Sequence, residues 1–205
     1  MKGKFITFEG VEGCGKSTQT RLLKEFLENK NIDVLATREP GGPKISEMIR
    51  KLLLDPENKE MLPETEMLLY MASRSQHTGE WILPALNSGK FVICDRFYDS
   101  TIAYQGAARN LDRKMIDMIR VYATYGLEPD LTILIDTPAE VGLSRISGRA
   151  IDRLEQESLS FHKKVRQGYL DIAKAEPERF LVIDGEQEIG AIQEDIRNKI
   201  LEIMR

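Results

Sequence analysis

The sequence predicts an α/β fold in which helices cover both faces of a five-stranded parallel sheet. Short apolar runs alternate along the chain with longer amphipathic segments, as in repeated strand–helix–strand units. Several of these runs are apolar on both faces, which suits a parallel sheet covered on both sides. The length of 205 residues fits one α/β domain, so a single domain over 1–205 is expected.

The strands are predicted at five apolar runs. These are residues 4–8, 33–37, 91–95, 131–136 and 179–184. In a doubly wound sheet, ligands bind beyond the carboxyl ends of the strands. The chemistry is therefore expected just after residues 8, 37, 95 and 136.

Amphipathic helices are predicted between these runs. The expected segments are 17–29, 44–54, 63–87, 112–125, 156–175 and 188–204. Pro84 is expected to kink or end the long third segment, because proline lacks the amide proton that a helix interior needs. Pro138 is expected to be the first residue of a further helix, where that proton has no partner in any case.

The composition favours a protein that acts on small molecules. Apolar residues make up 41% of the chain and the net charge is −4, so there is no basic footprint for a nucleic acid polymer. No apolar stretch approaches the roughly 18 residues of a membrane helix, and the N-terminal residues lack a signal-peptide core, so no membrane partner is expected. Cys14 and Cys94 have no metal-type spacing with His77 and His162, which favours buried thiols in a reducing, cytoplasmic compartment.

The first predicted strand leads into a glycine-rich loop. Residues 10–17, GVEGCGKS, match the P-loop pattern G-x-x-x-x-G-K-[ST], with a strand before them and a helix after. Glycines let backbone amides converge on a phosphate, and the helix points its positive end at the anion. Lys16 is expected to reach the β- and γ-phosphates and Ser17 to bind Mg²⁺. The sequence thus predicts a P-loop NTPase that binds a nucleoside triphosphate with Mg²⁺.

The P-loop alone leaves several enzyme classes open, since GTPases, motor ATPases and small-molecule kinases all use it. A GTPase should carry an N-K-x-D motif that reads the base. The nearest match is NKNID at 29–33, where the aspartate comes one position too late and precedes a strand. A kinase instead needs a second site, with cations for the acceptor phosphate and for the transferred group.

Two strand ends carry residues suited to that second site. Asp95 and Arg96 follow the third strand and could hold Mg²⁺ and a phosphate, or form an ordinary surface pair. Arg38 and Glu39 follow the second strand, where the Pro-Gly-Gly that comes next could equally be a common turn.

A third cationic segment lies at 142–155. Arg145, Arg149 and Arg153 recur there every four residues, so any helical part would place them on one face. Gly148 would interrupt that helix and allow a short hinged lid. The alternative interpretation is a solvated, charged helix face.

Four segments together resemble the thymidylate kinase family, whose members use ATP to phosphorylate dTMP. They are FEGVEGCGKST (8–18), TREPGG (37–42), DRF with STIAYQG (95–97 and 100–106) and DRLEQE (152–157). They occur in family order and spacing over the whole chain, which is far more specific than the P-loop alone. The resemblance implies a nucleoside monophosphate kinase-like fold and direct phosphoryl transfer from Mg·ATP to dTMP, giving dTDP and ADP for dTTP biosynthesis.

The resemblance also implies which residues bind dTMP. They are Glu12, Arg38, Arg50, Tyr70, Arg74, Arg96, Thr101, Tyr104 and Gln105. Tyr70 is expected to stack on the base and Arg74 to donate to a base carbonyl. Without the resemblance, Tyr70 could equally be a core residue and Arg74 a surface residue. Glu12 is expected to bind the sugar 3′-hydroxyl, and Tyr104 to crowd the 2′ carbon and disfavour ribose.

The same resemblance assigns the donor side and the catalytic groups. ATP is expected to bind at Gly10, Val11, Glu12, Gly13, Cys14, Gly15, Lys16, Ser17, Thr18 and Arg145. The catalytic groups are expected to be Lys16, Asp95, Arg96 and a lid arginine, which is Arg149 or, alternatively, Arg153. Ser17 and Asp95 are the expected Mg²⁺ ligands. Some family members carry an arginine inside the P-loop. This chain has none there, so the lid is expected to supply that cation, as in the bacterial subgroup.

Two other functions remain open from the sequence. One is a kinase for another (deoxy)nucleoside monophosphate, such as dUMP, and the other is a P-loop nucleotide-binding switch without an acceptor. The expected partners are ATP and dTMP. The resemblance also suggests a homodimer, formed through exposed apolar stripes such as those of 44–54 or 63–83.

Overall fold

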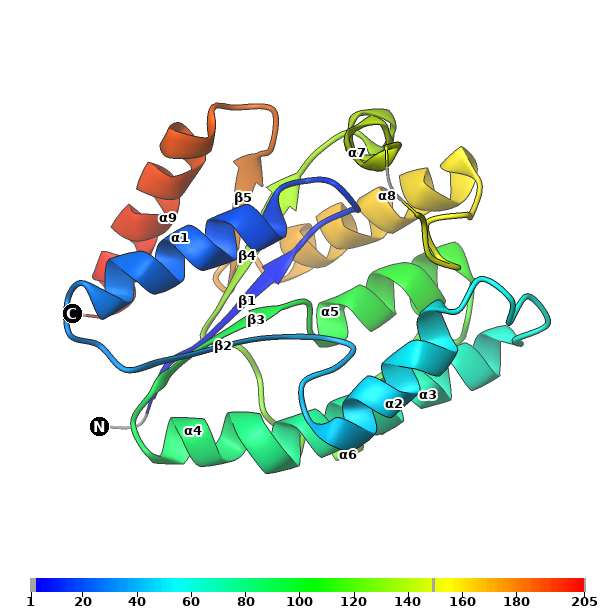
Figure 1. Ribbon diagram of the computed structural model, residues 1–205, viewed down its shortest axis with the longest axis horizontal. Helices are drawn as coiled ribbons and strands as arrows, with labels where there is room; N and C mark the ends of the chain where they lie inside the picture. The colour runs from blue at the N-terminus through cyan, green and yellow to red at the C-terminus, as the bar shows by residue number, and fades with distance from the viewer. Residues whose placement is uncertain (1–2, 149, 205) are drawn as a thin grey trace.

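The computed structural model describes residues 3–148 and 150–204, and it has the predicted α/β architecture (Figure 1). Its sheet consists of β1 (Phe5–Glu9), β2 (Val34–Arg38), β3 (Phe91–Asp95), β4 (Leu131–Asp136) and β5 (Phe180–Asp184). All pairings are parallel, in the order β2-β3-β1-β4-β5. Each strand begins and ends within one residue of the predicted position. The three inner strands, β3, β1 and β4, are almost completely buried, as their unbroken apolar runs predicted.

Helices cover both faces of the sheet. On one face, α1 (Lys16–Glu28) packs against β1, β2 and β3, and α9 (Ile189–Ile203) packs against α1 and β5. On the other face, α4 (Leu83–Asn87) contacts β3, and α8 (Leu159–Ala175) contacts β4 and β5. Figure 1 shows the strands running between these two layers.

Three further helices form a group beside the second layer. α2 (Lys44–Leu54) packs on α3 (Pro63–His77), and α3 packs on α6 (Arg113–Ala123). In Figure 1 the group lies at the end of the molecule towards which the strands point. A last helix, α7 (Ala139–Ile146), packs against α8. This arrangement surrounds the carboxyl edge of the sheet with helices.

The long helical pattern at 63–87 is interrupted, although not at Pro84. A π-helical segment, η1 (Thr78–Ile82), joins α3 to α4, and the proline lies in the first turn of α4. Proline fits there because its missing amide proton falls where a helix leaves amides unpaired. Pro138 also stands at a helix start. It is the N-cap of α7, however, and not its predicted first helical residue.

The helix that follows β3 was not predicted from the sequence. This is α5 (Tyr98–Thr101), continued by the π-helical segment η2 (Ile102–Ala108). Four consecutive residues of η2, 102–105, are buried, because the segment packs between α8 and the pocket described below. An unbroken buried run has no helical periodicity, so pattern reading could not detect it.

The cysteines and histidines lie in the interior. Cys14 and Cys94 are buried free thiols, and His77 and His162 are fully buried. Within residues 3–148 and 150–204, no group of three or more His, Cys, Asp or Glu side chains could hold a metal ion. In those same residues, no helix has both the length and the apolar character needed to cross a bilayer.

Candidate active site

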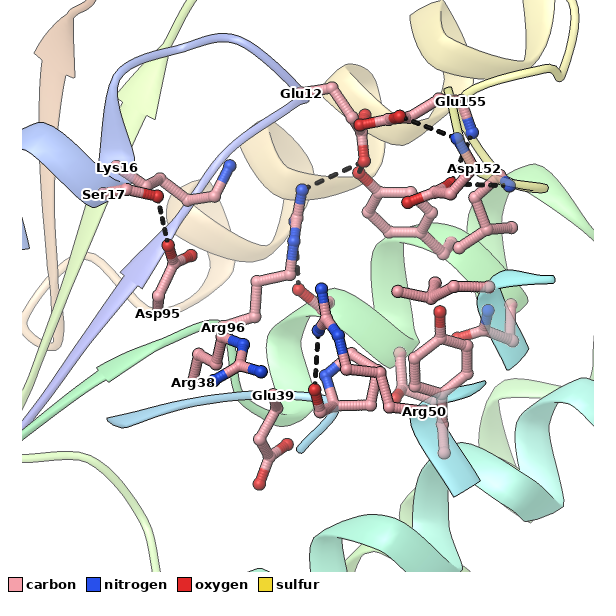
Figure 2. A pocket seen from close by; sticks show the side chains of 18 of the residues that line it. Glu12, Lys16, Ser17, Arg38, Glu39, Arg50, Asp95, Arg96, Asp152 and Glu155 are labelled. Atoms are coloured by element: carbon pink, nitrogen blue, oxygen red, sulfur yellow. Dashed lines mark hydrogen bonds and ion pairs between the residues drawn. The ribbon is translucent and has the colours of Figure 1, made fainter. Parts of the chain in front are cut away.

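The carboxyl ends of β1, β2 and β3 open into one pocket of about 260 Å³ (Figure 2). Predicted site residues that line it are Glu12, Gly13, Lys16, Ser17, Arg38, Arg50, Tyr70, Asp95, Arg96, Thr101, Tyr104 and Gln105. These residues come from the P-loop, α1, β2, α2, α3, β3, α5 and η2. The tertiary structure therefore brings P-loop residues and most of the predicted acceptor residues to one cavity.

The P-loop packs tightly against α7. Gly13 adopts a positive φ of 69°, and a Cβ atom placed there would lie 2.1 Å from the carbonyl oxygen of Gly142. A Cβ atom on Gly142 would in turn lie 2.2 Å from the carbonyl oxygen of Glu12. Both positions therefore exclude any side chain, and the loop is fixed against the helix that leads into the predicted lid.

Lys16 is held inside this loop. Its Nζ donates hydrogen bonds to the carbonyl oxygens of Gly10 at 3.0 Å and Val11 at 2.8 Å, and the side chain is 7% exposed. Some of the other residues predicted to bind ATP do not line the pocket, namely Gly10, Val11, Cys14, Gly15 and Thr18. Val11 and Cys14 are buried. Gly15 is nevertheless exposed and Thr18 partly exposed, so this part of the P-loop is accessible beside the cavity.

Ser17 and Asp95 form a pair of oxygen ligands. Ser17 Oγ donates to Asp95 Oδ2 at 3.0 Å, which joins the start of α1 to the end of β3 (Figure 2). Mg²⁺ prefers oxygen ligands and usually takes only one or two from the protein, with water and phosphate oxygens completing its octahedron. The hydroxyl and carboxylate thus fit a Mg²⁺ site that a bound nucleotide would complete.

Two arginines face the pocket from β2 and α2. Figure 2 shows Arg38 and Arg50 together across the pocket from Lys16 and Ser17. Arg50 Nη1 donates to the carbonyl oxygen of Pro40 at 2.6 Å, and Arg38 Nη2 bonds Glu47 at 3.0 Å. Burial, and then the neighbouring positive charge of Arg38, lower the pKa of Arg50. Two cations held side by side in a pocket favour the binding of an anion between them.

A third arginine, Arg96, is fixed by its surroundings. It has a φ of 71°, which is uncommon for a residue with a side chain. Its guanidinium donates to the carbonyl oxygen of Gly10 at 2.9 Å, to Tyr169 at 2.8 Å and to Glu12 at 3.0 Å. This contact network holds the strained backbone in place. Burial opposes a charge on Glu12, but Arg96, His162, Lys16 and Tyr104 together outweigh it and keep the pKa of that carboxyl well below its usual range.

Glu9 lies directly behind this network. It is fully buried and accepts hydrogen bonds from the Phe97 amide at 2.7 Å, Ser100 Oγ at 2.6 Å and the Tyr169 hydroxyl at 2.9 Å. Burial, reinforced by nearby Asp99, raises the pKa of Glu9 to about 7. A carboxyl that titrates near neutrality therefore supports the loop that carries Arg96.

The predicted base-binding wall is formed by α3, α5 and η2. Tyr70 was expected either in the core or at the base. It packs against the core and also lines the pocket. Thr101 and Gln105 line the same cavity, each with only 1% of its surface exposed. Tyr104 hydrogen-bonds Glu12 through its hydroxyl, so these two predicted sugar-side residues contact each other.

Arg74 does not line the pocket, and its interpretation as a surface residue is wrong. It is 1% exposed and donates to Glu39 Oε2 at 2.8 Å, to Thr101 Oγ1 at 2.9 Å and to the carbonyl oxygen of Phe97 at 3.0 Å. It therefore lies one layer behind the wall and holds Thr101 from behind. A guanidinium can be buried here because a carboxylate and two further acceptors satisfy it.

Arg145 and Arg153, the two described arginines of 142–155, do not share a helix face. α7 ends at Ile146, so only Arg145 is helical among those described. Arg145 is exposed and donates to the carbonyl oxygens of Gly13 and Gly185, each at 3.3 Å. Its guanidinium therefore bridges the P-loop and the loop after β5. Arg149 lies outside the described residues, and its catalytic role stays a prediction.

Arg153, the alternative lid arginine, points away from the pocket. It is 8% exposed, its Nε donates to the carbonyl oxygen of Leu53 at 2.9 Å, and its Nη2 lies 2.7 Å from Glu66 Oε2. Arg153 thus ties the segment after α7 to α2 and α3. In this arrangement it does not face the P-loop.

Several pocket residues were missed by sequence reasoning. Asp152, Leu154 and Glu155 line the cavity beside Glu12 (Figure 2), and Ser100 and Leu54 line it as well. The first three lie in DRLEQE, a segment that the resemblance had already singled out without giving them roles. Nothing local marks Leu54, which resembles any apolar residue at the end of an amphipathic helix.

The end of β4 does not line this pocket, whereas the prediction had placed chemistry just after position 136. Asp136 forms a two-point ion pair with Arg166 of α8, at 2.7 and 2.8 Å. That pair fastens the helix to the sheet. The pocket lies instead at β1, β2 and β3, on the opposite side of β1 from β4 and β5.

Comparison with known proteins agrees with this geometry. The family described as thymidylate kinase matches residues 8–196. The chain belongs to the thymidylate kinase family. It is 49% identical over 205 residues to a thymidylate kinase of Caldanaerobacter subterraneus subsp. tengcongensis, covering 100% of this chain and 98% of that protein.

Other thymidylate kinases give the same result. The chain is 50% identical to that of Geotalea uraniireducens, with 97% of each chain covered. It is 53% identical over 186 residues to that of Carboxydothermus hydrogenoformans, with 90% of each covered. The family resemblance noted from the sequence motifs is confirmed along almost the whole chain.

Proposed function

We propose that this chain transfers the γ-phosphoryl group of ATP to dTMP, giving dTDP and ADP in the synthesis of dTTP. Its membership of the thymidylate kinase family supports this activity. The observation that carries the proposal is a single pocket with Lys16, Ser17 and Asp95 on one side and Arg38 and Arg50 opposite (Figure 2). Donor and acceptor phosphates bound there would meet near the ends of β1 and β3.

On the acceptor side, the nucleoside occupies the wall made by α3 and η2. Tyr70 offers a ring face for stacking, and Thr101 and Gln105 offer polar groups to the base. Glu12 is ionised and accepts a hydrogen bond from the sugar 3′-hydroxyl, while Tyr104 occupies the space beside the 2′ carbon. Arg74 acts on the base through Thr101, to which it donates a hydrogen bond.

The acceptor phosphate lies between Arg38, Arg50 and Arg96. The first two bring positive charge to the pocket wall, although Arg38 is paired with Glu47, and Arg96 is held rigidly beside them. Guanidinium groups can grip a phosphate through two parallel hydrogen bonds. Such a grip orients one phosphate oxygen of dTMP towards the donor.

On the donor side, the P-loop amides and the start of α1 hold the ATP phosphates. Lys16 exchanges its backbone contacts for phosphate oxygens, and Arg145 lies beside the adenine. Ser17 and Asp95 would hold Mg²⁺, which would supply charge neutralisation to the ATP phosphates. Residues 142–155 act as the lid of a single domain, with Arg149 as the arginine that meets the transferred group.

The transfer is direct. A phosphate oxygen of dTMP attacks the γ-phosphorus, the bond to the β–γ bridging oxygen breaks, and ADP leaves with that oxygen. No protein nucleophile is required. Positive groups aimed at the transferred oxygens lower the barrier, and closure of the lid keeps out water, which would otherwise hydrolyse ATP.

The test is a panel of monophosphates incubated in turn with Mg·ATP, with ADP release measured and the product identified by mass. We expect dTMP to give dTDP with the highest kcat/KM. A higher value for another (deoxy)nucleoside monophosphate would contradict the proposed acceptor. ATP loss without any phosphorylated nucleotide would instead favour a nucleotide-binding switch.

We further propose that two copies associate through one apolar face. Exposed apolar side chains lie on α2, α3 and α6, namely Ile45, Met48, Leu52, Leu68, Met115, Met118, Val121 and Tyr122. Tyr122 is 84% exposed, an unusual exposure for so large an aromatic side chain. Extended apolar surfaces of this kind mark association sites. We also place the enzyme in the cytoplasm, where the free thiols of Cys14 and Cys94 stay reduced.

The oligomeric state can be measured by light scattering after size exclusion. The wild type is expected at twice the chain mass, and Tyr122→Asp at a lower apparent mass that depends on concentration. Ile189→Asp is the matched control, because it places the same charge at an exposed apolar residue of α9. A monomeric wild type would contradict the proposal.

A further inference from the structure

Glu66 is a charged residue buried behind the base-binding wall. It lies on α3 with 0% of its surface exposed, and its carboxylate is surrounded by donors from other segments. Oε1 accepts from Gln105 Nε2 at 2.8 Å and from Arg109 Nε at 3.3 Å. Oε2 accepts from Arg109 Nη2 at 3.1 Å and lies 2.7 Å from Arg153 Nη2. Two other segments of the chain, residues 105–109 and the segment of Arg153, therefore converge on this carboxylate.

The two arginines keep Glu66 in a single state. Burial disfavours its charge, but the hydrogen bonds from Arg109 and Gln105 outweigh burial and lower the pKa of Glu66. An ionised carboxylate can only accept hydrogen bonds. The group that Gln105 turns towards Glu66 must therefore be its NH₂ end.

This contact fixes which end of the Gln105 amide is available to a ligand. Gln105 lines the pocket, and its Nε2 is occupied by Glu66. No residue within 3–148 and 150–204 donates a hydrogen bond to its Oε1. The carboxamide oxygen is thus the group that Gln105 can offer to a base in the pocket.

We propose that Glu66 is a positioning residue for base selection, because it makes Gln105 present an acceptor to position N3 of the base. Thymine carries a hydrogen on N3 and can donate to that oxygen. Cytosine has a lone pair at N3, so two acceptors would face each other. The proposal rests on the proposed binding of dTMP in this pocket, and it predicts discrimination against cytosine but none between thymine and uracil.

Glu66→Gln tests the proposal. Arg109 Nη2 and Arg153 Nη2 both meet the Oε2 side, at 3.1 and 2.7 Å, whereas the Oε1 side has one longer arginine contact, from Arg109 Nε at 3.3 Å. The new amide oxygen should therefore take the Oε2 side, so that the new NH₂ group faces Gln105. Gln105 then turns its own oxygen to that NH₂ group and its NH₂ end to the base. We expect the ratio of kcat/KM for dTMP to that for dCMP to fall about tenfold, the equivalent of one hydrogen bond. The ratio for dTMP to dUMP should stay unchanged.

Glu157→Gln is the matched control. Glu157 Oε1 lies 2.6 Å from Arg109 Nη2, so this variant neutralises a carboxylate in the same ionic cluster without touching Gln105. Both variants should lower the thermal midpoint, but only Glu66→Gln should change the dTMP to dCMP ratio. An unchanged ratio in folded Glu66→Gln, or an equal change in Glu157→Gln, would overturn the proposal.

A crystal structure of the wild type with dTMP provides a test that needs no variant. It should place Gln105 Oε1 within hydrogen-bond distance of thymine N3 while Nε2 stays on Glu66. A Gln105 side chain out of reach of N3 would refute the positioning role even if dTMP proves to be the substrate. A wild type that does not phosphorylate dTMP would instead refute the proposed function itself.

Discussion

The acceptor wall and the donor side of the pocket are held together differently. Behind the acceptor wall, Thr101 and Gln105 are bonded to Arg74 and Glu66, side chains that are at most 1% exposed. On the donor side, Arg145 is exposed and donates to the carbonyl oxygens of Gly13 and Gly185, each at 3.3 Å. The proposed base-binding residues are thus held from the interior, whereas the proposed donor side is formed by P-loop backbone and an exposed arginine of α7.

Arg149→Ala should give the largest effect and would test whether the donor side depends on one lid cation. Turnover should fall by about 10³–10⁵, as for arginine fingers in other phosphoryl-transfer enzymes, while the affinity for dTMP changes little. Single-turnover kinetics would measure the rate of transfer, and equilibrium binding would measure the affinity for dTMP. Near-normal turnover would assign the catalytic role to another arginine of 142–155. It would also contradict the dependence of the donor side on Arg149.

Arg153→Met should affect stability more than chemistry. It removes a buried cation from Glu66 and should lower the free energy of unfolding by about 3 kcal/mol, since Glu66 retains Arg109. Urea denaturation measures this. Arg21→Met is the control, because it removes an exposed cation and should cost less than about 0.5 kcal/mol. A collapse of turnover with unchanged stability would instead make Arg153 the catalytic lid arginine.

Arg50→Met would sharpen the acceptor half of the comparison. Loss of a charge-assisted contact to the acceptor phosphate should lower kcat/KM for dTMP about 100-fold and leave ATP affinity unchanged. Thymidine, which has no phosphate, should bind wild type and variant equally in a calorimetric titration. Weaker thymidine binding in the variant would show that Arg50 supports the nucleoside wall rather than the phosphate.

Glu9→Gln should give the smallest effect, visible as a pH dependence of stability. Because the pKa of Glu9 is about 7 when folded, against 4.5 as its ordinary value, the folded state binds the extra proton between these pH values. The wild type should therefore lose on the order of 2 kcal/mol, relative to the variant, as the pH rises from 4.5 through 7. Parallel stability curves for the two proteins over that range would contradict this.

The sequence by itself determined the elements and the phosphate-binding loop. Strand positions followed from apolar runs, and the P-loop depends on Gly10, Lys16 and Ser17, which are close in the chain, so local spacing suffices to define it. The motifs also marked the pocket residues Arg38, Asp95 and Arg96. The segment α5–η2 escaped prediction because a continuous buried run carries no period.

Only the tertiary structure decided what stands behind the pocket wall. Glu66 and Gln105 are 39 residues apart, and Arg74 and Glu39 are 35 apart. Nothing in the neighbourhood of Glu66 or Arg74 distinguishes either from an exposed helix residue. A charged side chain can be buried only where partners from other segments satisfy it, and packing alone brings those partners together. Local patterns therefore predicted the P-loop and the charged residues at the strand ends, whereas the contacts that orient Thr101 and Gln105 depend on the assembled fold.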